Sequence, residues 1–124
     1  MQSRTILVVD DEWLIRNIIH RTLERHGFTV VTACNGEEAL TMLEQFQKSL
    51  GESIDLVITD LHMPVMDGHQ LIAKMRERNY EVKLLVISGK DSDRRPELET
   101  QGILFLPKPF FPITLLKKVH ELLG

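Results

Sequence analysis

The sequence predicts a single doubly wound α/β domain in which five parallel strands alternate with helices. Five short runs are almost continuously apolar or β-branched, as strands are when both faces of their sheet are covered. The stretches between them carry apolar residues at helical spacing. Strands and helices that alternate without a hairpin signal imply right-handed crossovers and a parallel sheet. The predicted strands are residues 6–9, 29–32, 56–59, 84–87 and 103–106.

Four helices are predicted from apolar stripes, and a fifth from its position alone. The stripes are Leu14, Ile15, Ile18, Ile19 and Leu23; Ala39, Leu40, Leu43 and Phe46; Leu71, Ile72 and Met75; and Leu115, Leu116, Val119, Leu122 and Leu123. The fourth helix should lie within residues 91–101, where Leu98 is the one large apolar residue and Pro96 suits a first helical turn. We therefore expect a short, mobile helix that begins near Arg95.

Length and composition indicate one domain over residues 1–124, without a linker. Residues 48–53 (KSLGES) are predicted to form a loop. Cys34 is the single cysteine, so it cannot form an internal disulfide, and the net charge of −3 does not favour nucleic-acid binding. No apolar run approaches the roughly 20 residues that span a bilayer, and no signal peptide is evident, so we expect a cytoplasmic protein without membrane contact.

The polar residues at the strand ends are the candidate functional residues, because ligands of open parallel sheets bind at the carboxyl ends of the strands. The first strand ends in Asp10 and Asp11, the third in Asp60, the fourth in Ser88, and the fifth reaches Lys108 after Pro107. In the flavodoxin-like strand order 2-1-3-4-5, the first and third strands are neighbours. The three aspartates should then meet and repel one another. A divalent cation or Lys108 is expected to balance their charge.

Four of these segments carry a family resemblance. In order along the chain, the first, third, fourth and fifth strands carry the motifs LVVDDE, VITDLHMPVMDG, VISG and LPKPF. Together they resemble the receiver domain of bacterial two-component response regulators, and the similarity extends over essentially the whole chain. Each motif alone is common, but the four in order at strand ends are specific.

The resemblance implies a phosphorylation site at Asp60. In the family, the matching aspartate takes a phosphoryl group from a phosphohistidine, here on a sensor histidine kinase or a histidine phosphotransfer protein, and a carboxylate can act as such a nucleophile. Lys108 would pair with the phosphoryl oxygens, and Ser88 would donate a hydrogen bond to one of them. The implied protein is a phosphoacceptor and not a turnover enzyme. Its own reactions would be Mg-dependent self-phosphorylation and self-dephosphorylation.

The resemblance also implies a Mg²⁺ site. Mg²⁺ takes oxygen ligands and binds through one or two carboxylates together with phosphate oxygens. Asp11 and Asp60 would be direct ligands, Asp10 would act partly through water, and the backbone carbonyl of His62 would complete the set. Glu12 is expected to begin the first helix, where its charge suits the N-terminal dipole.

The resemblance also implies a conformational switch. In the family, phosphorylation moves the residue that matches Ser88, and an aromatic residue three positions before the lysine that matches Lys108 moves into the vacated space. Phe105 stands at that position, without the hydroxyl of the tyrosine often found in the family. The expected output face is the fourth helix, fifth strand and fifth helix, read by a downstream protein target or by an output domain beyond this sequence. His62 and Lys90 are the candidates that set the lifetime of the phosphoryl group.

Structural roles are the alternatives for these residues. Asp10 or Asp11 could be a helix cap, Asp60 a turn residue and Lys108 a solvated lysine, whereas Asp67 and Gly68 are interpreted as a turn and cap. The Lys108-Pro109 bond is a candidate cis peptide, as in the family.

Three other functions remain open. A magnesium-dependent phosphatase would need a second aspartate where His62 stands. A flavin or nucleotide binding module would need a glycine-rich or hydroxyl-rich loop where DDEW stands. A receiver-like domain that is never phosphorylated is disfavoured, because the full set of site residues is present.

Overall fold

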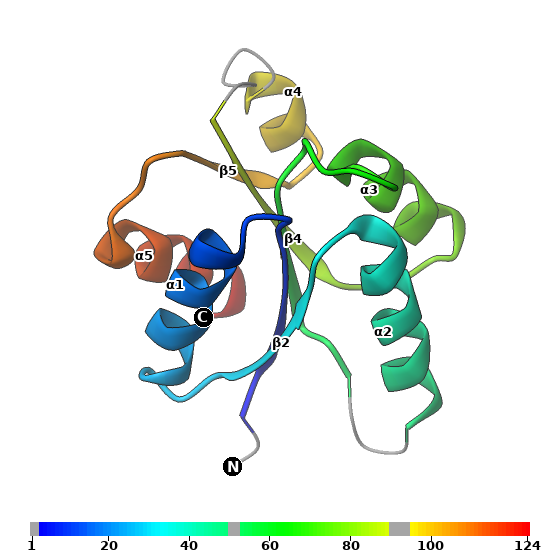
Figure 1. The fold of residues 1–124 in the computed structure, drawn as a ribbon, viewed down its shortest axis with the longest axis horizontal. Helices are drawn as coiled ribbons and strands as arrows, with labels where there is room; N and C mark the ends of the chain where they lie inside the picture. The colour runs from blue at the N-terminus through cyan, green and yellow to red at the C-terminus, as the bar shows by residue number, and fades with distance from the viewer. Residues whose placement is uncertain (1–2, 50–52, 90–94) are drawn as a thin grey trace.

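The computed structural model describes residues 3–49, 53–89 and 95–124 and contains one five-stranded parallel sheet (Figure 1). Its strand order is β2-β1-β3-β4-β5, which confirms the predicted fold class and topology. The strands are β1 (Thr5–Val9), β2 (Thr29–Ala33), β3 (Leu56–Thr59), β4 (Lys83–Ser88) and β5 (Leu104–Pro107). The helices are α1 (Trp13–Glu24), α2 (Gly36–Lys48), α3 (Gly68–Glu77), α4 (Arg95–Thr100) and α5 (Pro112–Leu123).

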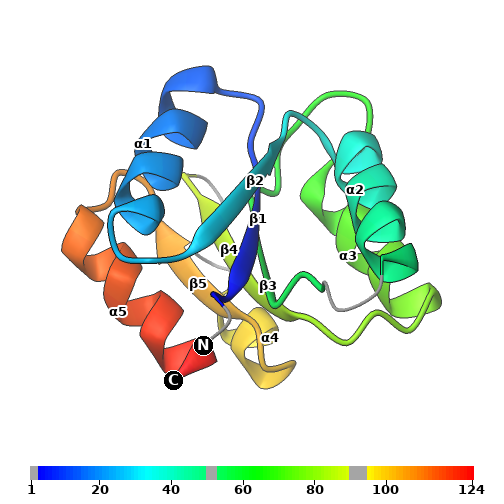
Figure 2. The same cartoon turned by 90° about the horizontal axis from the view of Figure 1, so that it is seen from below.

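Helices cover both faces of the sheet, as Figures 1 and 2 show with α1 and α5 on one side and α2 and α3 on the other. Alternate residues of β1 point to opposite faces. Ile6 and Val8 pack with α1 and α5, whereas Leu7 and Val9 pack with α2, α3 and α4. Each fully buried aliphatic side chain contributes about 1.5–3 kcal/mol to folding. The two apolar layers therefore hold the strand ends in fixed positions.

Side-chain caps fix the start of two helices near the carboxyl ends of the strands. Asn35 accepts a hydrogen bond of 2.9 Å from the Glu38 N–H at the start of α2. Asp67 and Gln70 form a reciprocal capping box at the start of α3, with bonds of 2.9 and 3.0 Å. The predicted structural role of Asp67 is thereby confirmed. The caps direct the turns that follow β2 and precede α3.

Within the described residues, α4 covers Arg95–Thr100, in the region where the sequence predicts the fourth helix. Leu98 is its buried residue, so a single apolar side chain anchors it to the sheet. Residues 90–94 and 50–52 lie outside the described residues. Consequently the proposed mobility of this segment and the middle of the 48–53 loop remain predictions.

The fifth strand is displaced by one residue from its predicted range. The sequence predicts Ile103 within the strand, but its N–H donates a 3.0 Å hydrogen bond to the Leu98 carbonyl and closes the end of α4. The strand begins at Leu104 and continues to Pro107, next to Lys108. Ile103 is buried, and in the sequence an apolar, β-branched residue at this place fits the pattern of a buried strand. In the described ranges, no helix combines the length and apolarity needed to cross a membrane.

Candidate functional site

The strand register brings distant polar residues to one edge of the sheet. Val9 pairs with Thr59 in neighbouring parallel strands, so Asp10 and Asp60 follow at the same level. Ser88 pairs with Pro107, and the Lys108 N–H donates a 3.0 Å hydrogen bond to the Ser88 carbonyl. The predicted meeting of these strand ends is therefore present in the fold.

The Lys108 ammonium lies at the centre of the site. Its Nζ donates hydrogen bonds to Asp60 Oδ2 at 2.7 Å, Asp10 Oδ2 at 3.0 Å and Glu12 Oε1 at 3.3 Å. The side chains of Lys108, Asp60 and Asp10 are 14%, 8% and 2% exposed, whereas that of Glu12 is 60% exposed. Short hydrogen bonds between charged groups are stronger at a partly buried site than the same hydrogen bonds are in water. Lys108 is therefore an integral part of the site and not a solvated lysine.

Burial and neighbouring charges shift the pKa values of Asp10 and Lys108, the two partners of one ion pair. Burial raises the pKa of Asp10 above its ordinary value, although hydrogen bonds from Glu12 N–H and Lys108 act in the opposite direction. Burial also lowers the pKa of Lys108, but its hydrogen bonds and charge interactions with Asp60 and Asp10 raise that pKa further than burial lowers it. Lys108 is accordingly a permanent cation near neutral pH, and it balances only one of the three neighbouring negative charges.

Glu12 takes a place in the site that the sequence did not predict. Carboxylate oxygens of Asp10, Glu12 and Asp60 lie within 4.8 Å of one another. Glu12 occupies the N-cap position of α1 but its side chain makes no capping hydrogen bond, and its carboxylate contacts Lys108 instead. Asp11, the expected direct ligand, is exposed. In the sequence, the signal for Glu12 is its position next to Asp10 and Asp11, although the helix dipole alone predicts only a place at the start of α1.

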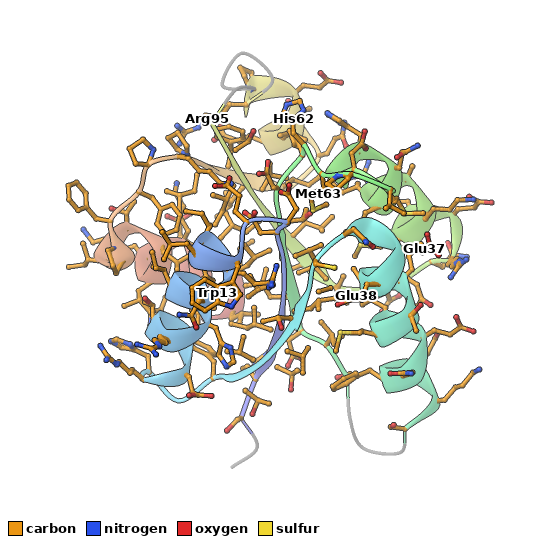
Figure 3. The ribbon with its side chains drawn as sticks, in the orientation of Figure 1. Trp13, Glu37, Glu38, His62, Met63 and Arg95 are labelled. Carbon is orange, nitrogen blue, oxygen red and sulfur yellow. The ribbon has the colours of Figure 1, made fainter. Side chains whose placement is uncertain are left out.

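The loop between β3 and α3 is pressed against the backbone of Asp60. A Cβ on Gly68 would lie 2.2 Å from the Asp60 carbonyl oxygen and 2.8 Å from the Leu61 Cα, so only glycine fits there. The Gly68 N–H also donates a 3.1 Å bond to the Leu61 carbonyl. His62 is exposed at this end of the molecule (Figure 3), and its N–H donates a 3.2 Å bond to Asp60 Oδ1. The loop thus orients the Asp60 carboxylate through its backbone.

Val65, in the same loop, has an unusual backbone conformation. Its φ is +68°, and the Met66 N–H donates a 2.8 Å hydrogen bond to the Pro64 carbonyl, two residues back. This is a γ-turn with positive φ, which is rare and strained, above all for a β-branched residue. Gly36 N–H donates a 2.9 Å bond to the Met66 carbonyl and ties the turn to α2.

Ser88 and Phe105 lie on adjacent strands behind the charged groups. Both are buried, Ser88 at the end of β4 and Phe105 in β5, where it pairs with Val86. Phe105 belongs to the same apolar cluster as Leu98, the anchor of α4. The Lys108-Pro109 peptide is cis, in agreement with the candidate assignment.

The fold and site define a class of doubly wound α/β domains with carboxylates and a lysine gathered at the carboxyl ends of β1, β3 and β5. A family model described as the response regulator receiver domain matches residues 6–120, and the chain belongs to this family. Receiver domains are the phosphoacceptor signalling domains of two-component systems. The resemblance inferred from the four motifs is thus confirmed.

Individual proteins show the same similarity. The sensor kinase CckA of Brucella abortus is 37% identical over 123 residues, which are 98% of this chain and 13% of the kinase. The alkaline phosphatase synthesis regulator PhoP of Bacillus subtilis is 33% identical over 98% of this chain and 49% of its own length. The structure of the chemotaxis protein CheY4 of Vibrio cholerae aligns with a TM-score of 0.80 and 31% identity, covering 98% of this chain and 99% of that one. This chain therefore spans half or less of these two curated relatives.

Proposed function

We propose that this domain is a signalling switch in which Asp60 accepts a phosphoryl group from the phosphohistidine of a sensor histidine kinase or histidine phosphotransfer protein. One observation carries the proposal: the Lys108 ammonium contacts both Asp60 and Asp10, which come from different strands and lie 48 and 98 positions away in the chain. A carboxylate beside a fixed positive charge is the arrangement that the proposed nucleophile would need. Phosphoryl transfer needs positioning and charge neutralisation of this kind.

The proposed transfer step uses the groups at the carboxyl ends of β3, β4 and β5. A carboxylate oxygen of Asp60 attacks phosphorus, the new P–O bond forms, and the P–N bond to the donor imidazole breaks. The imidazole nitrogen keeps the electron pair and takes up a proton. Lys108 neutralises charge on the phosphoryl oxygens, and the Ser88 hydroxyl donates a hydrogen bond to one of them. Lys108 Nζ lies 2.7 Å from Asp60 Oδ2, and Ser88 ends β4, the strand next to β3.

The donor set fits Mg²⁺, which prefers oxygen ligands. Asp10, Glu12 and Asp60 offer carboxylate oxygens within 4.8 Å of one another, and Lys108 leaves part of their negative charge unbalanced. We propose that Asp10, Asp11, Asp60 and the His62 carbonyl hold the ion, with Glu12 beside them. When bound, Mg²⁺ would neutralise charge that builds up on the transferring phosphoryl group.

Signalling is proposed to pass through the face formed by α4, β5 and α5. Phe105 and Leu98 share one apolar cluster, so a movement of Phe105 toward Ser88 would alter the packing that anchors α4. Because α4 has one buried residue, a small change in that packing has a large effect on its stability. Amide hydrogen exchange in α4, β5 and α5 should change on phosphorylation, and unchanged exchange there would contradict this part of the proposal.

We further propose that residues 1–124 form one receiver domain that works in the cytoplasm. The longer curated relatives favour a downstream protein target or an output domain outside this sequence. His62 remains a candidate for setting the lifetime of the phosphoryl group. Lys90 is a second candidate, but it lies outside the described residues. Exchange of either residue should alter the rate of self-dephosphorylation.

Intact mass measured after incubation with acetyl phosphate tests the proposal. We expect one added phosphoryl group that requires Mg²⁺ and is absent in Asp60→Asn. Asp67→Asn is the matched control, because asparagine also caps a helix and Asp67 lies outside the carboxylate cluster. Addition that persists in Asp60→Asn would contradict the assignment of the phosphoacceptor.

A further inference from the structure

Arg16 in α1 reaches back toward the acidic loop that precedes its helix. Its Nη1 donates a 2.7 Å hydrogen bond to the backbone carbonyl oxygen of Asp10, six positions earlier. The side chain is half-buried, and within the described parts of the chain its guanidinium makes no ion pair with a carboxylate. Arg16 is therefore a second cation at this end of the sheet, and it contacts the backbone and not a carboxylate group.

Asp10 has a different donor on each of its three oxygen atoms. The Glu12 N–H donates to Oδ1 at 2.9 Å, Lys108 Nζ donates to Oδ2 at 3.0 Å, and Arg16 donates to the backbone oxygen. With a side chain only 2% exposed, Asp10 has little freedom to turn. The conformation of residues 10–12 then depends on these donors together.

The three donors have different consequences for a bound cation. Lys108 occupies carboxylate oxygens that Mg²⁺ would need, and the Glu12 N–H occupies another. Arg16 brings positive charge near the same carboxylates without occupying any carboxylate oxygen. Some residues hydrogen-bond to a metal ligand without binding the metal themselves. Removal of such a residue typically lowers metal affinity by about 10-fold to 100-fold.

We infer that Arg16 is a positioning residue, which holds the peptide of Asp10 so that the carboxylates of Asp10 and Glu12 are preorganised around Lys108 and the cation. This inference deepens the proposed function and rests on it for the identity of the cation. Arg16 is not one of the carboxylate, hydroxyl and lysine residues assigned to the proposed phosphoryl transfer. The inference also predicts an effect without added metal, because the hydrogen bond joins two groups of the chain itself.

Three variants separate this role from a general contribution to α1. Arg16→Met removes the donor and keeps the length and apolar stem of the side chain. Arg16→Lys restores a donor, and since the contact uses a single nitrogen of the guanidinium, an ammonium can replace it. Arg21→Met is the matched control, because Arg21 is an exposed arginine of the same helix.

Two measurements follow the loop directly. The first is hydrogen exchange of the Glu12 amide in metal-free protein, relative to the amide of Ile19 within α1. The second is the Mg²⁺ concentration at half-saturation, obtained from amide NMR shifts. In Arg16→Met we expect about 10-fold faster Glu12 exchange relative to Ile19 and about 10-fold weaker Mg²⁺ binding. Arg16→Lys should recover most of both, and Arg21→Met should resemble the wild type.

Specific outcomes would overturn the inference. Wild-type values in Arg16→Met would do so, and so would exchange that increases equally at Glu12 and Ile19, since that result reports helix stability alone. Failure of the wild type to bind Mg²⁺ would instead contradict the proposed function. The ratio of Glu12 to Ile19 exchange would then decide the role of Arg16 by itself.

Discussion

Lys108 Nζ lies 2.7 Å from Asp60 Oδ2 and joins the end of β5 to the end of β3. Because Asp10 and Glu12 share the same ammonium, one lysine orders carboxylates that would otherwise repel one another. Under the proposed function, this contact exists only while the Asp60 carboxylate is unmodified. A phosphoryl group on Asp60 would present new oxygens to Lys108, so phosphorylation must rearrange these ion pairs.

Asp10→Asn is expected to stabilise the protein in the absence of divalent cations. Burial raises the pKa of Asp10 above 3.8, so the folded state holds this proton more tightly than the unfolded state. Ionisation of Asp10 therefore lowers the stability of the wild type as the pH rises from 3.8 through the folded pKa. Asparagine removes that cost, and Lys108 keeps Asp60 and Glu12 as partners. We expect a gain of about 1 kcal/mol in the free energy of unfolding at neutral pH.

Urea unfolding near pH 7 and below the ordinary pKa of 3.8 measures this effect. The difference between Asp10→Asn and the wild type should be largest near pH 7 and should disappear at the acidic end. Asp67→Asn, at an exposed helix cap, should stay within about 0.5 kcal/mol of the wild type. A difference that is independent of pH would show that charge burial is not the cause.

Lys108→Met should make the stability of the protein depend strongly on Mg²⁺. The substitution leaves three neighbouring carboxylates without their ammonium partner, and removal of one side of a buried ion pair costs about 3 kcal/mol or more. In the proposed site, Mg²⁺ would compete with Lys108 for Asp10 Oδ2 and Asp60 Oδ2. The ion should therefore raise the melting temperature of Lys108→Met more than that of the wild type.

Lys74→Met is the control for that experiment, because Lys74 makes an exposed ion pair of 3.7 Å with Glu77. Such a pair contributes less than about 1 kcal/mol. Thermal melts of both variants with and without Mg²⁺ are compared. Equal responses of Lys108→Met and Lys74→Met to Mg²⁺ would refute the competition.

Gly68→Ala should destabilise the fold and displace Asp60. The new Cβ would lie 2.2 Å from the Asp60 carbonyl oxygen, so the loop must move away from the strand end. Overpacking of this kind costs about 1–3 kcal/mol. Gly89→Ala is the control, since its Cβ would meet Lys108 Cβ at an ordinary 3.7 Å. Urea unfolding checks the prediction, and equal stability of the two variants would show that the loop yields without strain.

Val65→Gly should stabilise the protein by about 1 kcal/mol. A left-handed backbone costs an ordinary L-residue about 1–2 kcal/mol, and Val65 has φ of +68° with 72% of its surface exposed. Little packing is therefore lost with the side chain. Asn79→Gly is the matched comparison at φ of +57°, where asparagine already tolerates the conformation and the gain should be smaller. Equal or lower stability of Val65→Gly, measured by urea unfolding, would rule out the strain.

The strands and their order could be predicted because apolar runs such as residues 6–9 satisfy both faces of a parallel sheet. Asp10, Asp60 and Lys108 could be assigned to one site because the topology alone brings their strand ends together. The contact of Glu12 with Lys108 could not be predicted, since it depends on the direction of a side chain at a helix cap. Ile103 was misplaced because a buried residue that closes a helix looks like a strand residue.

The geometry of the loop between β3 and α3 could not be predicted from the sequence either. DG after a proline indicates a turn, and the cap by Asp67 was predicted from it. The positive φ of Val65 was not, because valine is among the residues least suited to that conformation. Hydrogen bonds from neighbouring backbone impose it, and these appear only in three dimensions.

Direct location of the phosphorylated residue tests whether Asp60 is the phosphoacceptor. The domain is phosphorylated with acetyl phosphate and Mg²⁺, the acyl phosphate is reduced with borohydride, and peptides are sequenced by tandem mass spectrometry. Reduction converts an aspartyl phosphate to homoserine and leaves free carboxylates unchanged. We expect homoserine at position 60 alone. Homoserine at position 10 or 11, or phosphorylation that leaves no homoserine, would contradict it.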